Sequence, residues 1–384
     1  MKKTFLKLAN VATMVAVAAL SFTSCSDDTQ SGDAGDAGDI TYLSGNLETQ
    51  TLDASKTYVI SGAVVVGDGV TLTVPAGMTI SAKAGFGNYI LVDRGGKMNV
   101  NGTASAPVTF NCVDEDSNWG GLIINGYAPV SGSSASGNEG ATEISNAYAY
   151  GGTNEADNSG SYTYMILDKT GAKSSGSVEH NGLTLNGVGN GTVIENIFVL
   201  ATADDGVEFF GGSVNVTNLL VVNSDDDMFD FTQGYTGTLK NCYGIWEDGY
   251  TSTESDPRGV EADGNLDGLA TDTDYNQSNF TIENMTIRVD SSFEMHDAIK
   301  IRRGAKATII NALVTGSGAA PADLIDFVDS KGDAASGTYV SVTSDFNCVD
   351  MLVATDASDY TVDYSTTSNT GCAASLFSWT GYEF

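Results

Sequence analysis

The chain has 384 residues, of which 49 are acidic and 17 basic, so its formal net charge at neutral pH is −32. A surface of this sign repels phosphate backbones and anionic headgroups, which excludes nucleic acid as a partner and membrane docking by charge attraction. Glycine is abundant, with 45 residues, whereas proline is rare, with 5. This composition suits strands joined by tight corners, and no stretch shows sustained helical periodicity.

The first 24 residues have the three parts of a secretory signal peptide. Basic residues are followed by an apolar run from 11 to 22 and then by small residues. The apolar run has about 12 residues, whereas a membrane-spanning helix needs about 20, so we expect a cleaved signal. Cys25 follows directly and resembles the lipid-modified cysteine of a lipobox. We therefore predict a lipid on Cys25 that anchors the protein in one membrane leaflet without spanning it.

The residues that follow Cys25 indicate where the protein is sent. The Ser-Asp-Asp run at 26–28 resembles the signal that directs lipoproteins of Bacteroidota to the outer face of the outer membrane. Residues 29–39 are small, acidic and of low complexity, which is typical of a flexible stalk. We therefore predict a signal peptide over 1–24, a lipidated cysteine with its stalk over 25–39, and a single folded domain over 40–384.

Four cysteines remain after Cys25: Cys112, Cys242, Cys348 and Cys372. Disulfides are permitted outside the cytoplasm, and four cysteines allow three full pairings. Cys348 and Cys372 are nearest along the chain and are our candidate disulfide. Cys242 lies in an apolar strand pattern and is expected to be a buried thiol. No cysteines have the spacing of a zinc site.

A motif centred on asparagine returns five times in the second half of the chain. Its asparagines are Asn196, Asn218, Asn241, Asn284 and Asn311, spaced by 22, 23, 43 and 27 residues. Each has an apolar residue two positions earlier and continues as a strand. Because 43 is nearly twice the repeat, a further coil or a long insertion should lie between Asn241 and Asn284. A unit of this length is typical of one coil of a parallel β-helix, in which asparagine tolerates a left-handed corner.

A second set of strands alternates with the asparagine motifs. Each begins with a polar turn residue and continues with alternating apolar positions. The turn residues are Asn181, Asp205, Asp227, Asp297 and Asp323. The first half of the chain is predicted to consist of similar short strands. We predict insertion loops at residues 127–160 and 244–279. We predict a right-handed parallel β-helix, with the hand given by the β-crossover rule. A sandwich or propeller would not explain one motif that returns at one spacing.

Several runs of the sequence resemble a known family. They extend from Trp119 to Gly126, over parts of 151–160, from Asn181 to Gly189, and from Asp204 to Gly212. The family consists of large secreted or lipidated β-helix surface proteins of Bacteroidota, and the resemblance covers most of residues 55–384. It implies the fold and an outer-membrane location facing outward. The family has no agreed biochemical activity, so the resemblance leaves the function open.

Charged residues recur at the middle position of the second set of strands. They are Glu208, Asp230, Lys300 and Asp326, preceded by Thr184. Because strands stack about 4.8 Å apart, Glu208 and Asp230 should be neighbours that raise each other's pKa or share a cation. Together with Lys300 they are our candidate catalytic residues. β-Helix pectate lyases use carboxylates, calcium and a basic residue, and β-helix polygalacturonases use several aspartates. The alternative is an outward row of stacked polar residues without catalysis.

Residues 263–274 resemble a calcium-binding loop. Asp263, Asn265 and Asp267 would supply side-chain oxygens, Leu269 a backbone carbonyl, and Asp274 the final carboxylate. Oxygen ligands at this spacing can surround one hard cation, although Asp274 replaces the usual bidentate glutamate. Calcium is therefore the cofactor that the sequence suggests.

Three aromatic residues, Tyr243, Trp246 and Tyr250, lie at the start of the second insertion and could stack on sugar rings. Packing of the loop is the alternative explanation for them. Our leading hypothesis is a surface binding or adhesion module for an extracellular glycan or a host surface ligand, held to the membrane by its lipid alone. A β-helix polysaccharide lyase or glycoside hydrolase is the first alternative. A purely structural surface protein is the second.

Overall fold

A computed structural model of the protein describes residues 40–142, 144–174, 178–265, 275–364 and 368–384. The predicted signal peptide, Cys25 and the stalk lie outside the described residues. Two short 3-10 helices, η1 (Ala357–Asp359) and η2 (Ala374–Thr380), are the helical elements of the described part, and all other elements there are strands. No helix within the described ranges is long and apolar enough to cross a membrane.

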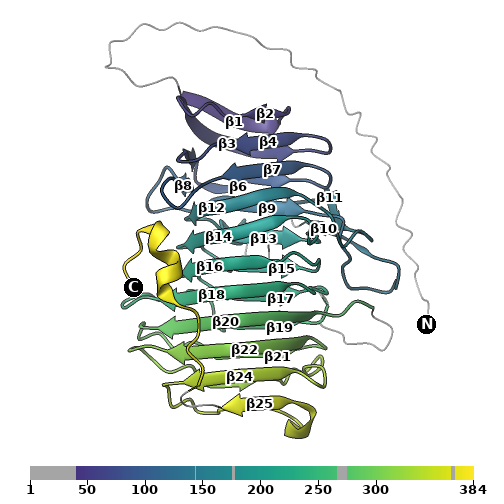
Figure 1. The fold of residues 1–384 in the computed structure, drawn as a ribbon, viewed down its shortest axis with the longest axis vertical. Coiled ribbons are helices and arrows are strands. Elements are labelled where there is room, and N and C mark those ends of the chain that lie inside the picture. Colours follow the sequence, from purple (N-terminus) through teal and green to yellow (C-terminus); the bar gives the residue numbers. More distant parts are fainter. Residues whose placement is uncertain (1–39, 143, 175–177, 266–274, 365–367) are drawn as a thin grey trace, which may run out of the picture. The chain divides into compact units, whose positions relative to one another are not determined.

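The strands of residues 40–384 wind into coils that stack through parallel pairing, and 23 of them belong to one paired network. The stack is visible in Figure 1, where successive coils follow one another in sequence order. The parallel β-helix predicted from the repeats is therefore confirmed. One face of the second half consists of short strands and is called the short-strand face. Its strands are β13 (Leu183–Asn186), β15 (Val207–Phe210), β17 (Phe229–Thr232), β19 (Val260–Asp263), β21 (Asp297–Arg302) and β23 (Asp323–Asp326).

Long strands alternate with these short strands. They are β12 (Gly160–Asp168), β14 (Val193–Leu200), β16 (Val216–Val222), β18 (Thr238–Trp246), β20 (Asn279–Val289), β22 (Lys306–Thr315) and β24 (Tyr339–Ser344), followed by β25 (Thr361–Tyr364). Most of them bend at the repeated asparagine, whose φ lies between 57° and 59°. The two halves of each bent strand therefore belong to two further faces of the coil.

The first half of the domain builds the same three faces, mostly from separate strands. They are β1 (Ile40–Asn46), β2 (Gln50–Thr51), β3 (Thr57–Val66), β4 (Thr71–Val74), β5 (Thr79–Ala82), β6 (Gly85–Val92), β7 (Lys97–Asn101), β8 (Val108–Cys112) and β9 (Trp119–Asn125). β7 and β8 pair with the two halves of β12, and β9 pairs with β13. The short-strand face therefore continues through β9 and β6 toward the start of the domain.

The repeated asparagines form a hydrogen-bonded row, here called the asparagine ladder. The Nδ2 group of Asn218 donates to Oδ1 of Asn196 at 2.9 Å, and Asn241 donates to Asn218 at the same distance. Asn284 donates to Asn241, and Asn311 donates to Asn284, both at 2.8 Å. Asparagine meets two requirements here, because it tolerates the left-handed conformation and its amide both donates and accepts along the stack.

The direct bond from Asn284 to Asn241 shows that the 43-residue interval is one enlarged coil. The region predicted as an insertion, 244–279, contains the end of β18 and all of β19, which takes its place on the short-strand face. That prediction was therefore wrong in part. The other expected insertion, 127–160, carries an antiparallel hairpin of β10 (Glu139–Thr142) and β11 (Ser145–Gly151).

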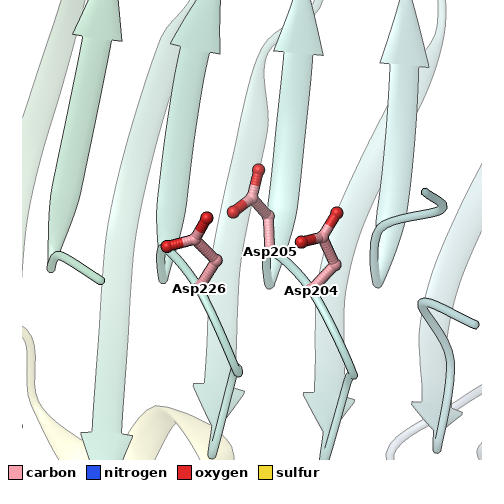
Figure 2. A group of neighbouring side chains, drawn as sticks. All are labelled: Asp204, Asp205 and Asp226. Carbon is pink, nitrogen blue, oxygen red and sulfur yellow. The ribbon is translucent and has the colours of Figure 1, made fainter. Parts of the chain in front are cut away.

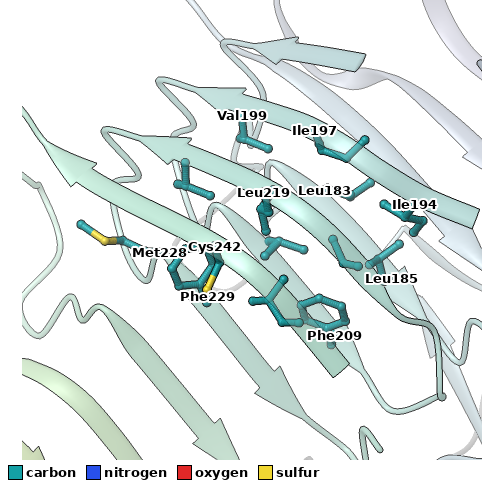
Figure 3. Close-up of a cluster of buried hydrophobic side chains, with 14 of the residues drawn as sticks. Leu183, Leu185, Ile194, Ile197, Val199, Phe209, Leu219, Met228, Phe229 and Cys242 are labelled. Atoms are coloured by element: carbon teal, nitrogen blue, oxygen red, sulfur yellow. The ribbon is translucent and has the colours of Figure 1, made fainter. Parts of the chain in front are cut away.

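The interior of the coils is filled by aliphatic and aromatic side chains from all three faces (Figure 3). Alternation along each strand decides which side chains point inward, as Leu183 and Leu185 do on β13. The equivalent rings of Phe209 and Phe231 stack with centroids 4.9 Å apart, and Phe280 from the long strand β20 stacks on Phe231 at 4.2 Å. The hydrophobic core is therefore a continuous column along the stack.

The C-terminal segment returns along the outside of the stack, where Figure 1 shows it beside β14, β16 and β18. Phe377 of η2 is fully buried there against outward-facing apolar residues such as Phe198 and Tyr243. The backbone N–H of Thr370 donates to Oδ1 of Asn311 at 2.7 Å, and the segment thereby occupies the open end of the asparagine ladder. An apolar strip on the outer surface is thus covered by the chain's own last residues.

The cysteines of the described part are all free thiols, so the predicted Cys348–Cys372 disulfide is wrong. The two residues lie in different apolar clusters. Cys372 packs beneath the C-terminal segment, whereas Cys348 packs against the main core. Cys242 is a buried thiol, as its strand pattern predicted.

Replacement of Asn241 tests the asparagine ladder. Asn241→Ala removes two side-chain hydrogen bonds and forces alanine into a left-handed backbone, so we expect the free energy of unfolding to fall by about 2–4 kcal/mol. Asn241→Gly should lower the free energy of unfolding less than Asn241→Ala does, because glycine adopts the left-handed backbone conformation without strain. Denaturant unfolding of both variants is the measurement. Exposed Asn190, replaced by alanine, is the control, and equal losses for Asn190 and Asn241 would contradict the role of the ladder.

Candidate functional site

The parallel register places the charged middle residues of the short-strand face in one row. The order along the stack is Thr184, Glu208, Asp230, Glu261, Lys300 and Asp326. The sequence analysis predicted this row but missed Glu261, because its strand had been assigned to an insertion. A signal was present, since Gly259-Val260-Glu261 repeats Gly206-Val207-Glu208.

A second acidic row lies at the turns that lead into the same strands. Asp205 and Asp227 occupy equivalent positions three residues before Glu208 and Asp230. Their neighbours in sequence, Asp204 and Asp226, lie beside them. Figure 2 shows the carboxyl groups of Asp204, Asp205 and Asp226 close together at neighbouring turns, and at least one oxygen of each lies within 4.8 Å of the others.

The two rows and the β10–β11 hairpin enclose a cavity of about 280 Å³, here called the acidic cavity. The hairpin contributes Thr142, Ile144 and Tyr150, and the hydroxyl of Tyr150 donates to Oε1 of Gln233 at 2.6 Å. No lysine or arginine is among the described residues that line this cavity. Eight carboxyl groups line it, from Glu179, Asp204, Asp205, Glu208, Asp226, Asp227, Asp230 and Glu261.

Burial and mutual repulsion raise the pKa values of most of these carboxyl groups. Burial, reinforced by Glu179, raises the pKa of Asp204 to about 9, and Lys173 offsets only part of this. Burial, reinforced by Glu261, raises the pKa of Asp226 to about 7. The pKa values of the fully buried carboxyl groups at Asp205, Glu208, Asp227 and Asp230 are raised well above their usual range, with burial as the largest cause.

Glu208 and Asp230 are the most closely linked pair of the row. Their side chains are hydrogen-bonded to each other, which requires a proton between two carboxyl groups. The amide Nδ2 of Asn181 also donates to Oε2 of Glu208, at 2.5 Å. The structure therefore brings together the two carboxylates that the sequence singled out.

The basic residues around the acidic cavity are engaged with acidic partners at its edges. Lys173 pairs with Asp204 at 3.3 Å and with Glu254. Arg258 donates to Asp297 at 2.9 Å and also pairs with Glu261. These pairs neutralise the rim, whereas Glu208 and Asp230 form no ion pair with any lysine or arginine of the described residues.

Lys300 lies outside the acidic cavity. It is buried, pairs with Asp326 and donates to the backbone carbonyl of Val328 at 2.9 Å. Glu261 separates it from Asp230 in the row. The predicted grouping of Lys300 with Glu208 and Asp230 in one catalytic site is therefore not what the structure shows.

His180 was not singled out by the sequence, yet it lines the acidic cavity. Its ring stacks on Phe86 at 3.9 Å between centroids, and burial lowers its pKa to about 4. The imidazole is therefore neutral at physiological pH, and its Nε2 atom has no hydrogen-bond partner in the described structure. In the sequence, only the position of His180 directly before the turn residue Asn181 could have indicated that it lines the cavity.

The predicted calcium loop is only partly described. Asp267, Leu269 and Asp274 lie outside the described residues. Asp263 pairs with Arg302 at 2.8 Å and with Arg303 at 2.6 Å. Asn265 is buried close by in the chain. The first carboxylate of the expected loop is thus neutralised by two guanidinium groups, and a calcium ion there would have to compete with both.

The predicted glycan-stacking residues do not form an exposed platform. Trp246 is fully buried, and its indole N–H donates to the carbonyl of Ser224 at 3.1 Å. Tyr243 is covered by the C-terminal segment. The hydroxyl of Tyr250 donates to the same carbonyl at 2.9 Å. Packing of the core and loop, the alternative named for these residues, is what the structure shows.

The chain belongs to the family described as pectate-lyase like beta helix domain, whose model matches residues 45–381. Among solved structures, the chain is similar to the catalytic domain of a GH87 α-1,3-glucanase in complex with nigerose and to a variant of that domain with tetrasaccharides. Each is 14% identical with a TM-score of 0.33, and the match covers 86% of this chain and 64% of the other. The likeness concerns the fold alone. No curated protein matches this chain significantly.

The raised pKa of Asp226 makes stability depend on pH. Its pKa is about 7 in the folded protein against an ordinary value of 3.8, so folding takes up a proton between these values. The contribution is fully present below about pH 4 and is lost as pH rises through 7, at about 1.4 kcal/mol per pH unit. Burial is the largest cause of the raised pKa, the nearby acids led by Glu261 add to it, and Arg258 opposes them.

We therefore expect Asp226→Asn to gain stability relative to the unmodified protein as pH rises from 5 to 8. Denaturant unfolding at several pH values within this window measures the difference. Asp363→Asn, at an exposed carboxylate far along the stack on β25, is the matched control and should leave the pH dependence unchanged. A difference between Asp226→Asn and the unmodified protein that is constant with pH would contradict the raised pKa.

Proposed function

We propose that this protein is a lipid-anchored surface protein that binds a glycan in the acidic cavity. The observation that carries the proposal is the cavity itself, which is covered by a hairpin on the outer side of a rigid stack. Sites of this kind, about 300 Å³ or larger with convergent polar groups, are the usual form of small-molecule sites. Carbohydrate recognition also agrees with the family to which the chain belongs.

The lining of the cavity suits a sugar ring. Polar groups come from the turns and the short-strand face, while Ile123, Ile144 and Phe210 add apolar surface near the hairpin. A pyranose has hydroxyl groups on its rim and C–H groups on its faces, and these need both kinds of surface. The hairpin comes from the 127–160 region, in line with the general use of loops for recognition on a rigid scaffold.

Binding without cleavage is favoured over a lyase reaction. A lyase of the β-helix type needs a free basic residue, and Lys300 is engaged with Asp326 outside the cavity. Arg258 and Arg302 both bind Glu261. The residues described thus offer no free lysine or arginine as a base in this cavity.

Glycoside hydrolysis is the second candidate, and the Glu208–Asp230 pair favours it. One member is protonated while the other accepts its proton, which is the division of roles between a general acid and a carboxylate base. Their direct hydrogen bond counts against it, because glycosidase carboxyl groups are about 5–5.5 Å apart in retaining enzymes and farther apart in inverting ones. The pair would have to separate around a substrate before it could act.

A glycan array with the full-length protein tests the proposed function. We expect binding to at least one glycan, weakened about tenfold or more by Asp230→Asn and by Glu208→Gln, because both line the cavity. Glu195→Gln is the matched control, at an exposed position on β14 away from the cavity. The same glycans are then assayed for new reducing ends.

Binding without new reducing ends supports a binding protein. New reducing ends that disappear in Glu208→Gln would replace this proposal with the hydrolase. Absence of binding to any glycan, or equal weakening by Glu195→Gln, would contradict the proposed site.

The location is a separate part of the proposal and depends on residues 1–28. We expect Cys25→Ser to abolish incorporation of radiolabelled fatty acid, because the thiol is the only group the lipid can join at that position. Cell fractionation and protease treatment of intact cells report the location of both forms. Cys348→Ser is the control. Label retained in Cys25→Ser would contradict the lipid anchor.

A further inference from the structure

We propose that the acidic cavity selects glycans that carry a free amino group, that is, hexosamine units with an unacetylated ammonium. This inference rests on the proposed glycan-binding function and names its substrate class. The ammonium would bind among Asp205, Glu208 and Asp230, beside the amide of Asn181. At least one carboxylate oxygen of each of these three acids lies within 4.8 Å of the others.

The unpartnered atoms of the cavity form the first argument. Oδ1 of Asn181, Oδ1 of Asp230 and Nε2 of His180 are buried without hydrogen-bond partners, in side chains that are only 5%, 8% and 3% exposed. Oδ1 of Asp226 is in the same state. Buried polar groups are normally paired, and leaving one unpaired costs about 1–3 kcal/mol. A ligand that supplies partners is therefore expected.

All of these atoms are suited to accept hydrogen bonds. The Asn181 amide is oriented by its own donation to Glu208, which leaves its carbonyl oxygen as the free group. His180 is neutral, and its hydrogen bond with the backbone of Phe86 leaves Nε2 as the open nitrogen. An ammonium offers three donors and no acceptor, whereas a hydroxyl offers one donor and brings lone pairs of its own. The acceptor-only set therefore fits an ammonium best.

Charge is the second argument. Eight carboxyl groups line the cavity, and no lysine or arginine is found among its described lining residues. An entering uronate or sulfate would find no basic side chain among these lining residues, so we expect acidic sugars not to bind. A cation between Glu208 and Asp230 would replace their shared proton and relieve the repulsion between the two carboxylates.

The apolar part of the lining separates an amino sugar from a bare metal ion. Three apolar residues also line the cavity: Ile123, Ile144 and Phe210. A divalent cation makes no favourable contact with such apolar side chains. Calcium takes six to eight oxygen ligands at about 2.3–2.6 Å, without apolar contacts. A sugar ring would place its C–H face on this surface and its ammonium among the carboxylates. N-Acetylation removes the positive charge of the sugar nitrogen. It also adds a carbonyl oxygen, an acceptor that cannot pair with the unpartnered acceptor atoms of the cavity.

The test compares glucosamine oligomers with fully N-acetylated oligomers of the same length, by isothermal titration of the full-length protein near neutral pH. Oligogalacturonate serves as the acidic sugar. We expect the glucosamine oligomer to bind at least about tenfold more tightly than its acetylated counterpart, and oligogalacturonate not to bind. Asp230→Asn should remove most of this preference, while Glu195→Gln should retain it. Asp205→Asn is the second cavity variant, should Asp230→Asn fail to fold.

The outcomes separate the inference from the proposed function. Equal affinity for the two oligomers, or a preference for oligogalacturonate, overturns the inference while glycan binding stands. Failure of every glycan to bind overturns both. A parallel titration with calcium chloride gives the last outcome: calcium binding that is lost in Asp230→Asn, with no preference for the amine, would assign the cavity to a metal ion and overturn the inference.

Discussion

Backbone hydrogen bonding between parallel coils sets the distance at which everything else in this domain is arranged. Neighbouring strands lie about 4.8 Å apart, so equivalent side chains of successive coils are always near neighbours. The same spacing that lets Asn241 bond to both Asn218 and Asn284 also places Glu208 against Asp230. In the first case the stacked groups attract. In the second they repel unless a proton or another cation lies between them.

The fold could be predicted from the sequence because stacking imposes a period on the chain. The asparagine motif and the apolar alternation are both direct consequences of the coil, and both are visible in one sequence. The carboxylate pair Glu208 and Asp230 followed from the same period. Glu261 was not predicted as a member of this row, because its coil is 43 residues long and a lengthened loop interrupts the period of the sequence.

The remaining parts of the site could not be predicted, because they depend on contacts between segments that the repeat along the stack does not relate to each other. The hairpin of 139–151 covers the cavity, yet nothing in its sequence indicates which face it folds onto. The burial of Trp246 likewise depends on residues that the period along the stack does not identify. The pairing of Cys348 with Cys372 was inferred from distance along the chain, which says little about distance in space.

The C-terminal segment changes how the domain should fold. A solenoid in which each coil contacts only its neighbours has mostly short-range contacts and can lose its end coils one at a time. Here the last residues pack on β14, β16 and β18, more than 100 residues earlier in the chain, and bond to Asn311 on the way. These long loops must close before the outer apolar strip is covered, which raises the contact order and slows folding. Once closed, the segment ties terminal and central coils into one cooperative unit, so the end of the stack cannot unravel independently of its middle.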